Sequence, residues 1–96
     1  MNRKEYYDLF LKEWGLESQY NQVLEEMAEL TQAICKLHRP DKQNIKADVE
    51  EDVKSEIADV LNCVEQMEHI FGYEEIEALR DYKLKRTVER MKKDAK

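Results

Sequence analysis

Two pairs of carboxylates are the residues in this 96-residue sequence best suited to chemistry. Glu26 and Glu29 are three residues apart, and so are Glu56 and Asp59, so each pair projects from one side of a helix. At about 100° per residue, both pairs lie roughly 100° and 160° from the centre of the apolar stripe on their own helix. If the two helices pack as antiparallel neighbours, both pairs line the same edge of the groove between them.

Carboxylates gathered in one groove repel one another unless a cation joins them. Mg²⁺ binds carboxylate and water oxygens and keeps coordination positions open for phosphate oxygens, and Mn²⁺ is a possible substitute. The alternative is chance, because the chain has 22 acidic residues and some will be spaced this way on solvated helix faces. We interpret Glu50, Glu51, Glu74 and Glu75 as residues of that kind.

The helices that must position these carboxylates are marked by glycine and proline. Gly15 and Gly72 are natural ends for a first and a third helix, and Pro40 prevents the second helix from continuing. Ser18 is a suitable N-cap for the second helix, and Asp48 with Glu51 resembles a capping box for the third. The predicted helices cover residues 4–14, 18–38, 48–71 and 74–92, with a polar connection over residues 39–46.

Apolar residues recur at helical spacing along the second and third predicted helices, opposite polar faces. The stripes predict that these helices pack against each other or against a partner. Their residues are Tyr20, Val23, Met27, Leu30, Ile34 and Leu37, and then Val53, Ile57, Val60, Val64, Met67 and Phe71.

Composition favours a single all-α domain over residues 1–96, arranged as a four-helix bundle-like protomer. Charged residues make up 40% of the chain, and it has two glycines and one proline. A net charge of −6 argues against nucleic acid as a partner. No apolar run is long enough for a membrane span, and Cys35 and Cys63 are interpreted as buried, reduced thiols, so we expect a cytoplasmic protein. A chain this small favours completion of its core by a second copy.

Two segments resemble the motifs of the MazG-like all-α nucleoside triphosphate pyrophosphohydrolases. Residues 25–30, with the sequence EEMAEL, are similar to the EExxE motif of that family, and residues 56–61, EIADVL, are similar to its ExxD motif. The resemblance extends over roughly residues 14–91 and includes the basic segment at residues 82–86. It implies an enzyme that hydrolyses a nucleoside or deoxynucleoside triphosphate to the monophosphate and pyrophosphate, and that works as a homodimer or homotetramer.

The resemblance also implies roles for the carboxylates. Glu26, Glu29, Glu56 and Asp59 would hold Mg²⁺, and Glu25 would help with a second metal or orient the attacking water. A metal-bound water needs no nucleophilic side chain.

Candidates for substrate contacts are less specific than the carboxylates. Lys83, Arg86 and Arg90 share one face of the last predicted helix and are candidates for the phosphates, the alternative being a solvated basic face. Trp14, Gln19 and Asn62 are candidates for the base or sugar; for Trp14 the alternative is a core anchor, and for Asn62 a helix-surface amide.

Two other functions are compatible with the same motifs. A phosphoribosyl-ATP pyrophosphohydrolase would use the same carboxylates with a different pocket. A non-catalytic helical module would use the acidic edge to bind a basic partner, and it would tolerate exchange of carboxylates within that edge. A di-iron bundle is disfavoured because the residue three positions before His69 is Gln66, not glutamate.

Overall fold

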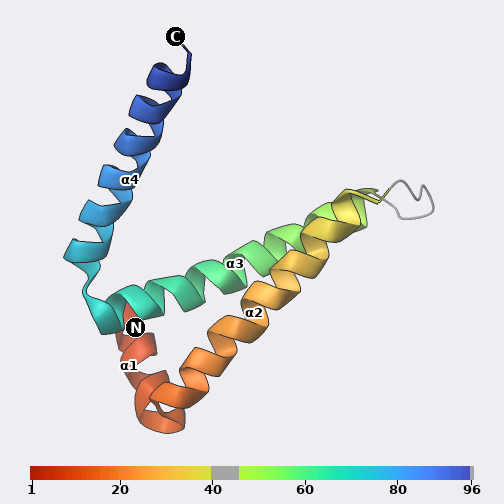
Figure 1. Ribbon diagram of the computed structural model, residues 1–96. Helices are drawn as coiled ribbons and strands as arrows, with labels where there is room; N and C mark the ends of the chain where they lie inside the picture. The colour runs from red at the N-terminus through yellow and green to blue at the C-terminus, as the bar shows by residue number, and fades with distance from the viewer. Residues whose placement is uncertain (40–45, 96) are drawn as a thin grey trace.

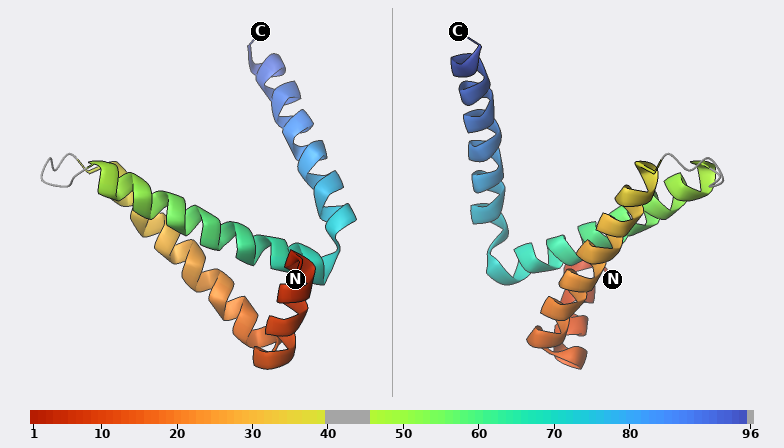
Figure 2. Two further views of the ribbon diagram at one scale, coloured as in Figure 1. Left: turned by 180° about the vertical axis from the view of Figure 1, so that it is seen from behind. Right: turned by 45° about the vertical axis from the view of Figure 1, so that its right-hand side comes forward.

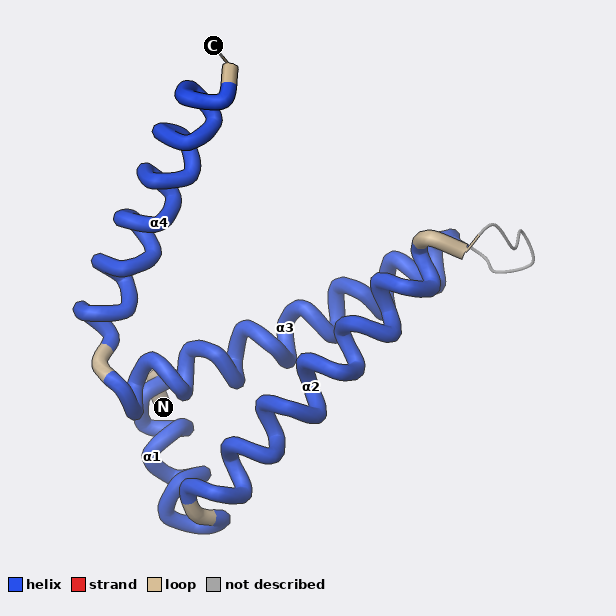
Figure 3. Tube along the Cα trace, in the orientation of Figure 1, coloured by secondary structure: helices blue, strands red, loops and turns tan. Residues whose placement is uncertain are grey.

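The computed structural model describes residues 1–39 and 46–95, and within this part of the chain all regular structure is helical (Figures 1 and 3). The predicted all-α class is therefore confirmed. The polar connection predicted at residues 39–46 falls largely outside the described residues. The helices are α1 (Arg3–Trp14), α2 (Leu16–Leu37), α3 (Lys46–Phe71) and α4 (Tyr73–Asp94).

Helices α2 and α3 form a long antiparallel hairpin, which is the main packing unit of the chain. The two helices lie side by side near their connection and diverge at the other end, where α1 lies across both (Figures 1 and 2). Helix α4 leaves the end of α3 and projects away from the hairpin. Within the described residues, α4 contacts α3 but neither α1 nor α2.

Glycine sets both sharp turns between helices. Gly15 has φ 84° and Gly72 has φ 117°, backbone values that other residues rarely adopt. Because the chain turns within Gly15, α2 begins at Leu16, and the start predicted near Ser18 is slightly late. At the start of α1, the Asn2 side chain accepts a hydrogen bond from the Glu5 backbone N–H at 2.9 Å, and Glu5 Oε1 accepts one from the Asn2 N–H at 3.2 Å.

The line of contact between α2 and α3 differs from the one that the stripes suggest. Val23 and Ala33 are buried there and Leu30 and Val60 are half-buried. The contact also includes the carboxylates of Glu26 and Glu56, so each helix is rotated toward its acidic flank. As a result, one half of each predicted stripe remains exposed, namely Met27, Ile34 and Leu37 on α2 and Ile57, Val64 and Phe71 on α3.

Helix α1 is fixed to the end of α3 by three polar contacts, of which the ion pair between Arg3 and Glu65, at 3.6 Å, is the longest. The hydroxyl of buried Tyr7 donates a hydrogen bond to Glu65 at 2.8 Å. Asp8 Oδ1 and His69 Nε2 lie 2.7 Å apart. These contacts hold α1 across the open end of the hairpin.

Two further predictions concern the burial of the cysteines and the absence of a membrane-spanning helix. Cys63 is half-buried, but Cys35 is exposed, so the prediction of two buried thiols was wrong for Cys35. Cys35 lies on the side of α2 away from α3, where the hairpin leaves it uncovered. Among the described helices, none combines the length and the apolar composition needed to cross a bilayer.

Candidate metal centre

Three carboxylates from two helices meet near the middle of the hairpin. One carboxylate oxygen from each of Glu26, Glu29 and Glu56 lies within 4.8 Å of the other two. Glu26 and Glu29 come from consecutive turns of α2, and Glu56 comes from α3. Glu26 and Glu56 are half-buried in the contact between the helices, whereas Glu29 is exposed. We call these three residues the acidic cluster.

Asp59 lies at the margin of the acidic cluster, one turn after Glu56 on α3. Its side chain is exposed, and it is not among the three residues whose oxygens lie within 4.8 Å. Its negative charge nevertheless contributes to the raised pKa values of both Glu26 and Glu56. The four carboxylates that the sequence analysis proposed as metal ligands therefore lie near one another on the α2–α3 hairpin.

Burial and charge make the acidic cluster unfavourable for the free protein. Burial raises the pKa of Glu26, and the charges of Glu29, Asp59 and Glu56 raise it further. The pKa of Glu56 is raised by burial first and then by the charges of Glu29 and Asp59. Oε2 of Glu26 and Oε2 of Glu56 are both buried without a hydrogen-bond partner. Buried carboxylate oxygens without donors are what a hard divalent cation would satisfy, so the donor set fits Mg²⁺.

Several neighbours of the acidic cluster were missed by the sequence analysis. Gln22 Nε2 donates a hydrogen bond to Glu26 Oε1 at 2.8 Å and so orients that carboxylate. The charge of Asp52 adds to the raised pKa of Glu56. Burial raises the pKa of the Cys63 thiol, with smaller contributions from Glu26 and Asp59. The sequence spacing could have identified two of these neighbours. Gln22 lies four residues before Glu26, and Asp52 lies four residues before Glu56, so each is one helical turn from its carboxylate.

A cavity of about 390 Å³ opens beside the acidic cluster toward the connection between α2 and α3. Glu29 and Glu56 line it together with Gln32 and Lys36 of α2 and Asp52 of α3. Lys36 is two turns beyond Glu29 on the same face of α2. The cavity is therefore lined by a basic residue as well as by carboxylates, and the sequence analysis did not select this residue.

The basic candidates of the last helix do not approach the acidic cluster within one chain. Lys83, Arg86 and Arg90 are carried by α4, which among the described residues contacts α3 alone. The guanidinium of Arg86 lies over the Tyr82 ring, 5.6 Å from its centroid.

The candidates for base and sugar contacts are spread over three places. Trp14 is exposed at the end of α1 and stacks on Phe10, with ring centroids 5.3 Å apart. Gln19 is buried near the start of α2, with 6% of its surface exposed. Asn62 lines a separate cavity of about 620 Å³ between α3 and the start of α4, which Arg80 also lines. Glu25 is exposed on α2 beside Glu26.

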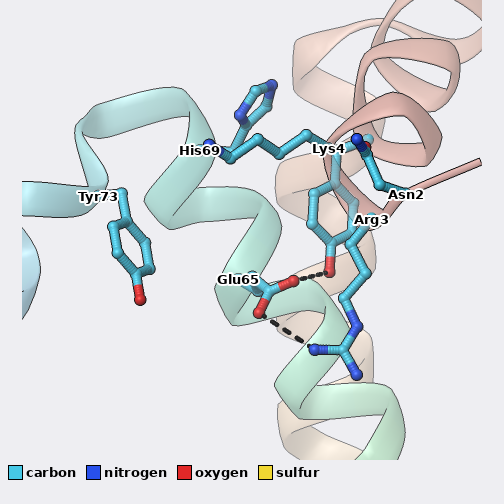
Figure 4. A pocket seen from close by; sticks show the side chains of 7 residues that line it. Asn2, Arg3, Lys4, Glu65, His69 and Tyr73 are labelled. Atoms are coloured by element: carbon cyan, nitrogen blue, oxygen red, sulfur yellow. Dashed lines mark hydrogen bonds and ion pairs between the residues drawn. The ribbon is translucent and has the colours of Figure 1, made fainter.

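A second polar group lies where α1 meets the end of α3 (Figure 4). Glu65 accepts the Tyr7 hydrogen bond and lies 3.6 Å from the Arg3 guanidinium. These residues border an open cavity of about 690 Å³, together with Lys4, His69 and Tyr73. Burial and the hydrogen bond to Glu65 raise the pKa of Tyr7 to about 12. Because its polar groups are paired across the α1–α3 contact, we interpret the group as structural.

Comparisons with family models, with curated proteins and with solved structures gave no match to this chain.

Proposed function

We propose that this protein is a Mg²⁺-dependent nucleoside triphosphate pyrophosphohydrolase. The observation that carries the proposal is the convergence of Glu26, Glu29 and Glu56 within 4.8 Å, with two buried carboxylate oxygens that have no hydrogen-bond partner. The resemblance of residues 25–30 and 56–61 to the MazG-like motifs gives the reaction: cleavage of a nucleoside or deoxynucleoside triphosphate into the monophosphate and pyrophosphate. The setting we propose is a cytoplasmic homodimer or homotetramer.

In this proposal Glu26, Glu29, Glu56 and Asp59 hold Mg²⁺, with Mn²⁺ as a substitute. When bound, the cation supplies charge neutralisation of the triphosphate and a water of lowered pKa. Gln22 keeps the Glu26 carboxylate oriented through its 2.8 Å hydrogen bond. Glu25 orients the attacking water or serves a second metal.

The cavity beside the acidic cluster suits the phosphates of the substrate. Lys36 lines it, and its ammonium group can pair with a phosphate oxygen. Lys83, Arg86 and Arg90 stay candidates for phosphate contacts, but only in an assembly of copies, because α4 of the same chain contacts α3 alone among the described residues.

The test is pyrophosphate release from the eight common ribonucleoside and deoxyribonucleoside triphosphates, with Mg²⁺ and with EDTA. We expect release from at least one nucleotide, dependence on Mg²⁺, and a loss of roughly 100-fold or more for Glu29→Ala, because the exposed Glu29 carboxylate provides affinity for the cation rather than packing. Glu50→Ala is the matched control, since it removes one exposed carboxylate from α3 away from the acidic cluster.

Two results would overturn the proposal. Release that is insensitive to EDTA or to Glu29→Ala would remove the assigned role of the acidic cluster. No release from any nucleotide at micromolar protein would favour a phosphoribosyl-ATP substrate or a non-catalytic acidic module. Phosphoribosyl-ATP as an added substrate separates these two.

A further inference from the structure

The corner between α3 and α4 contains the cavity of about 620 Å³, which side chains of both helices line. Within the described residues α4 contacts α3 alone, so the side chains in this corner determine where α4 lies (Figure 1). Glu68 is in the last turn of α3, where its carbonyl accepts a hydrogen bond from the Gly72 N–H at 2.8 Å. Glu77 is in the second turn of α4. Both glutamates line the cavity, so two carboxyl groups meet across the glycine turn.

The charged groups that line this cavity are three carboxylates and two guanidinium groups. The Arg80 guanidinium donates to both carboxylate oxygens of Glu77, at 3.0 and 2.8 Å. Arg3 of α1 pairs with Glu65 at 3.6 Å. Glu68 is 9% exposed, and in the part of the chain that the structure describes its buried Oε2 has no hydrogen-bond partner. One proton on Glu68 balances the corner at two negative and two positive charges, which is favourable for a buried group without a cation of its own.

The contact between the two glutamates requires that proton. The side chain of Glu68 is hydrogen-bonded to that of Glu77, and two carboxyl groups form such a bond only if one of them is protonated. The hydrogen bonds from Arg80 and Glu68 lower the pKa of Glu77. The hydrogen bond to Glu77, then burial, then the charge of Glu77 raise the pKa of Glu68; Glu65 raises it further and Arg80 lowers it. Glu68 is therefore the donor and Glu77 the acceptor.

We propose that Glu68 and Glu77 form a proton-dependent latch, in which the Glu68 carboxyl donates a hydrogen bond to Glu77 and so holds α4 against α3. When Glu68 loses its proton, two carboxylates face each other and the latch opens. Gly72 is the hinge, because its φ of 117° lies in a region of backbone conformation that glycine enters freely. Helix α4 has no buried residue among those described, so little else opposes its movement. The latch does not depend on the catalytic function proposed above.

The latch is closed at low pH and opens as the pH rises. A carboxyl whose pKa is raised in the closed form stabilises that form fully below its pKa in the open form, and this contribution is lost as pH rises through the raised pKa. In the open form Glu68 is released toward 4.5, the ordinary value for glutamate. The ratio of closed to open chains should therefore fall by up to about tenfold per pH unit between 4.5 and the raised pKa of Glu68.

The test is the distance between α3 and α4 as a function of pH, measured by double electron–electron resonance in the full chain without nucleotide. Spin labels are attached at exposed positions of the two helices through Lys54→Cys and Lys92→Cys, in a chain that also carries Cys35→Ser and Cys63→Ser. Dilution with unlabelled chain restricts the measurement to distances within one chain. We expect a narrow distance distribution near about pH 5 that broadens or shifts toward about pH 8.

Two variants separate the latch from other effects of pH. Glu68→Gln should keep the closed distance at every pH, because its amide donates to the Glu77 carboxylate without a titrating proton. Glu77→Gln should also remove the pH dependence, because its amide can donate to ionised Glu68. Glu74→Gln is the matched control and should respond to pH like the wild type, since Glu74 is exposed in the first turn of α4 and does not line the cavity.

Three results would overturn the proposal. The first is a wild-type distance that does not change with pH, and the second is a change that persists in Glu68→Gln. The third is a ¹³C chemical shift of the Glu68 carboxyl that titrates at or below 4.5 in the wild type. Circular dichroism shows whether each variant is still helical, and Glu77→Gln keeps the test valid if Glu68→Gln does not fold. Since no nucleotide is present, failure of the latch and failure of the proposed enzyme activity are distinguishable.

Discussion

Replacing Glu26 by glutamine is expected to change the stability of the protein in opposite directions with and without Mg²⁺. Glutamine has the same shape and can still accept the hydrogen bond from Gln22, so the substitution removes charge and little else. In metal-free protein the charge is unfavourable, because burial and neighbouring carboxylates raise the pKa of Glu26. In our proposal, the same carboxylate is one of the ligands of bound Mg²⁺.

The magnitudes follow from the separation of the carboxylates. Two unit charges about 4.8 Å apart repel by roughly 0.9 kcal/mol in a water-like dielectric. Since Glu26 is only half-buried, we expect Glu26→Gln to stabilise the metal-free protein by about 1 kcal/mol, or about 4–8 °C in Tm. At 100 times its Kd, Mg²⁺ stabilises the wild type by about 2.7 kcal/mol, and a 10- to 100-fold weaker Kd reduces this to about 1.4–0.4 kcal/mol.

Thermal unfolding in EDTA and across a Mg²⁺ titration measures both effects, with Glu50→Gln as the control for loss of an exposed charge. A carboxyl with a raised pKa destabilises the folded state as pH rises through that pKa, so the advantage of Glu26→Gln in EDTA should shrink as pH falls toward 4.5, the ordinary value for glutamate. If the variant is less stable than wild type in EDTA, or if Mg²⁺ stabilises both equally, the reasoning about the acidic cluster is refuted.

Two further predictions test the groups around the acidic cluster and at the α1–α3 contact. Lys36→Ala should raise KM for the nucleotide by roughly tenfold and change the stabilisation by Mg²⁺ little, because in our proposal Lys36 contacts phosphate and not the cation. Steady-state kinetics measures KM, with Lys54→Ala as the control. An unchanged KM in Lys36→Ala would contradict the prediction. Tyr7→Phe should cost about 1–3 kcal/mol in denaturant unfolding, since it removes a hydrogen bond to the Glu65 carboxylate. The wild type should lose its advantage over Tyr7→Phe between pH 10 and about pH 12, because the unfolded chain loses the phenol proton first. If the difference in stability between wild type and Tyr7→Phe stays constant across that range, the folded state does not raise the pKa of the Tyr7 phenol, and the prediction is refuted.

Local features of this fold were predictable because single residues determine them. Gly15 and Gly72 end helices through backbone conformations that need glycine, and the predicted ends at these positions agree with α1 and α3. The start of α2 was less accurate, since Ser18 is a good N-cap in general but the turn at Gly15 had already begun the helix. The direction of α4 depends on the backbone conformation of Gly72, which the periodicity of apolar residues does not predict.

The rotation of α2 and α3 about their own axes could not be predicted from the stripes, because it depends on two contacts at once. The two stripes, centred on Met27 in α2 and on Ile57 in α3, indicate which residues avoid water. They do not indicate which of these residues contact the other helix of the hairpin. In the hairpin, Glu26 and Glu56 lie in the contact, and Met27 and Ile57 lie outside it. This is unfavourable for a lone hairpin, which exposes apolar side chains and half-buries carboxylates. In our proposal a second copy would cover the exposed apolar residues and a cation would bind the acidic cluster, so both features of the isolated hairpin would then become favourable.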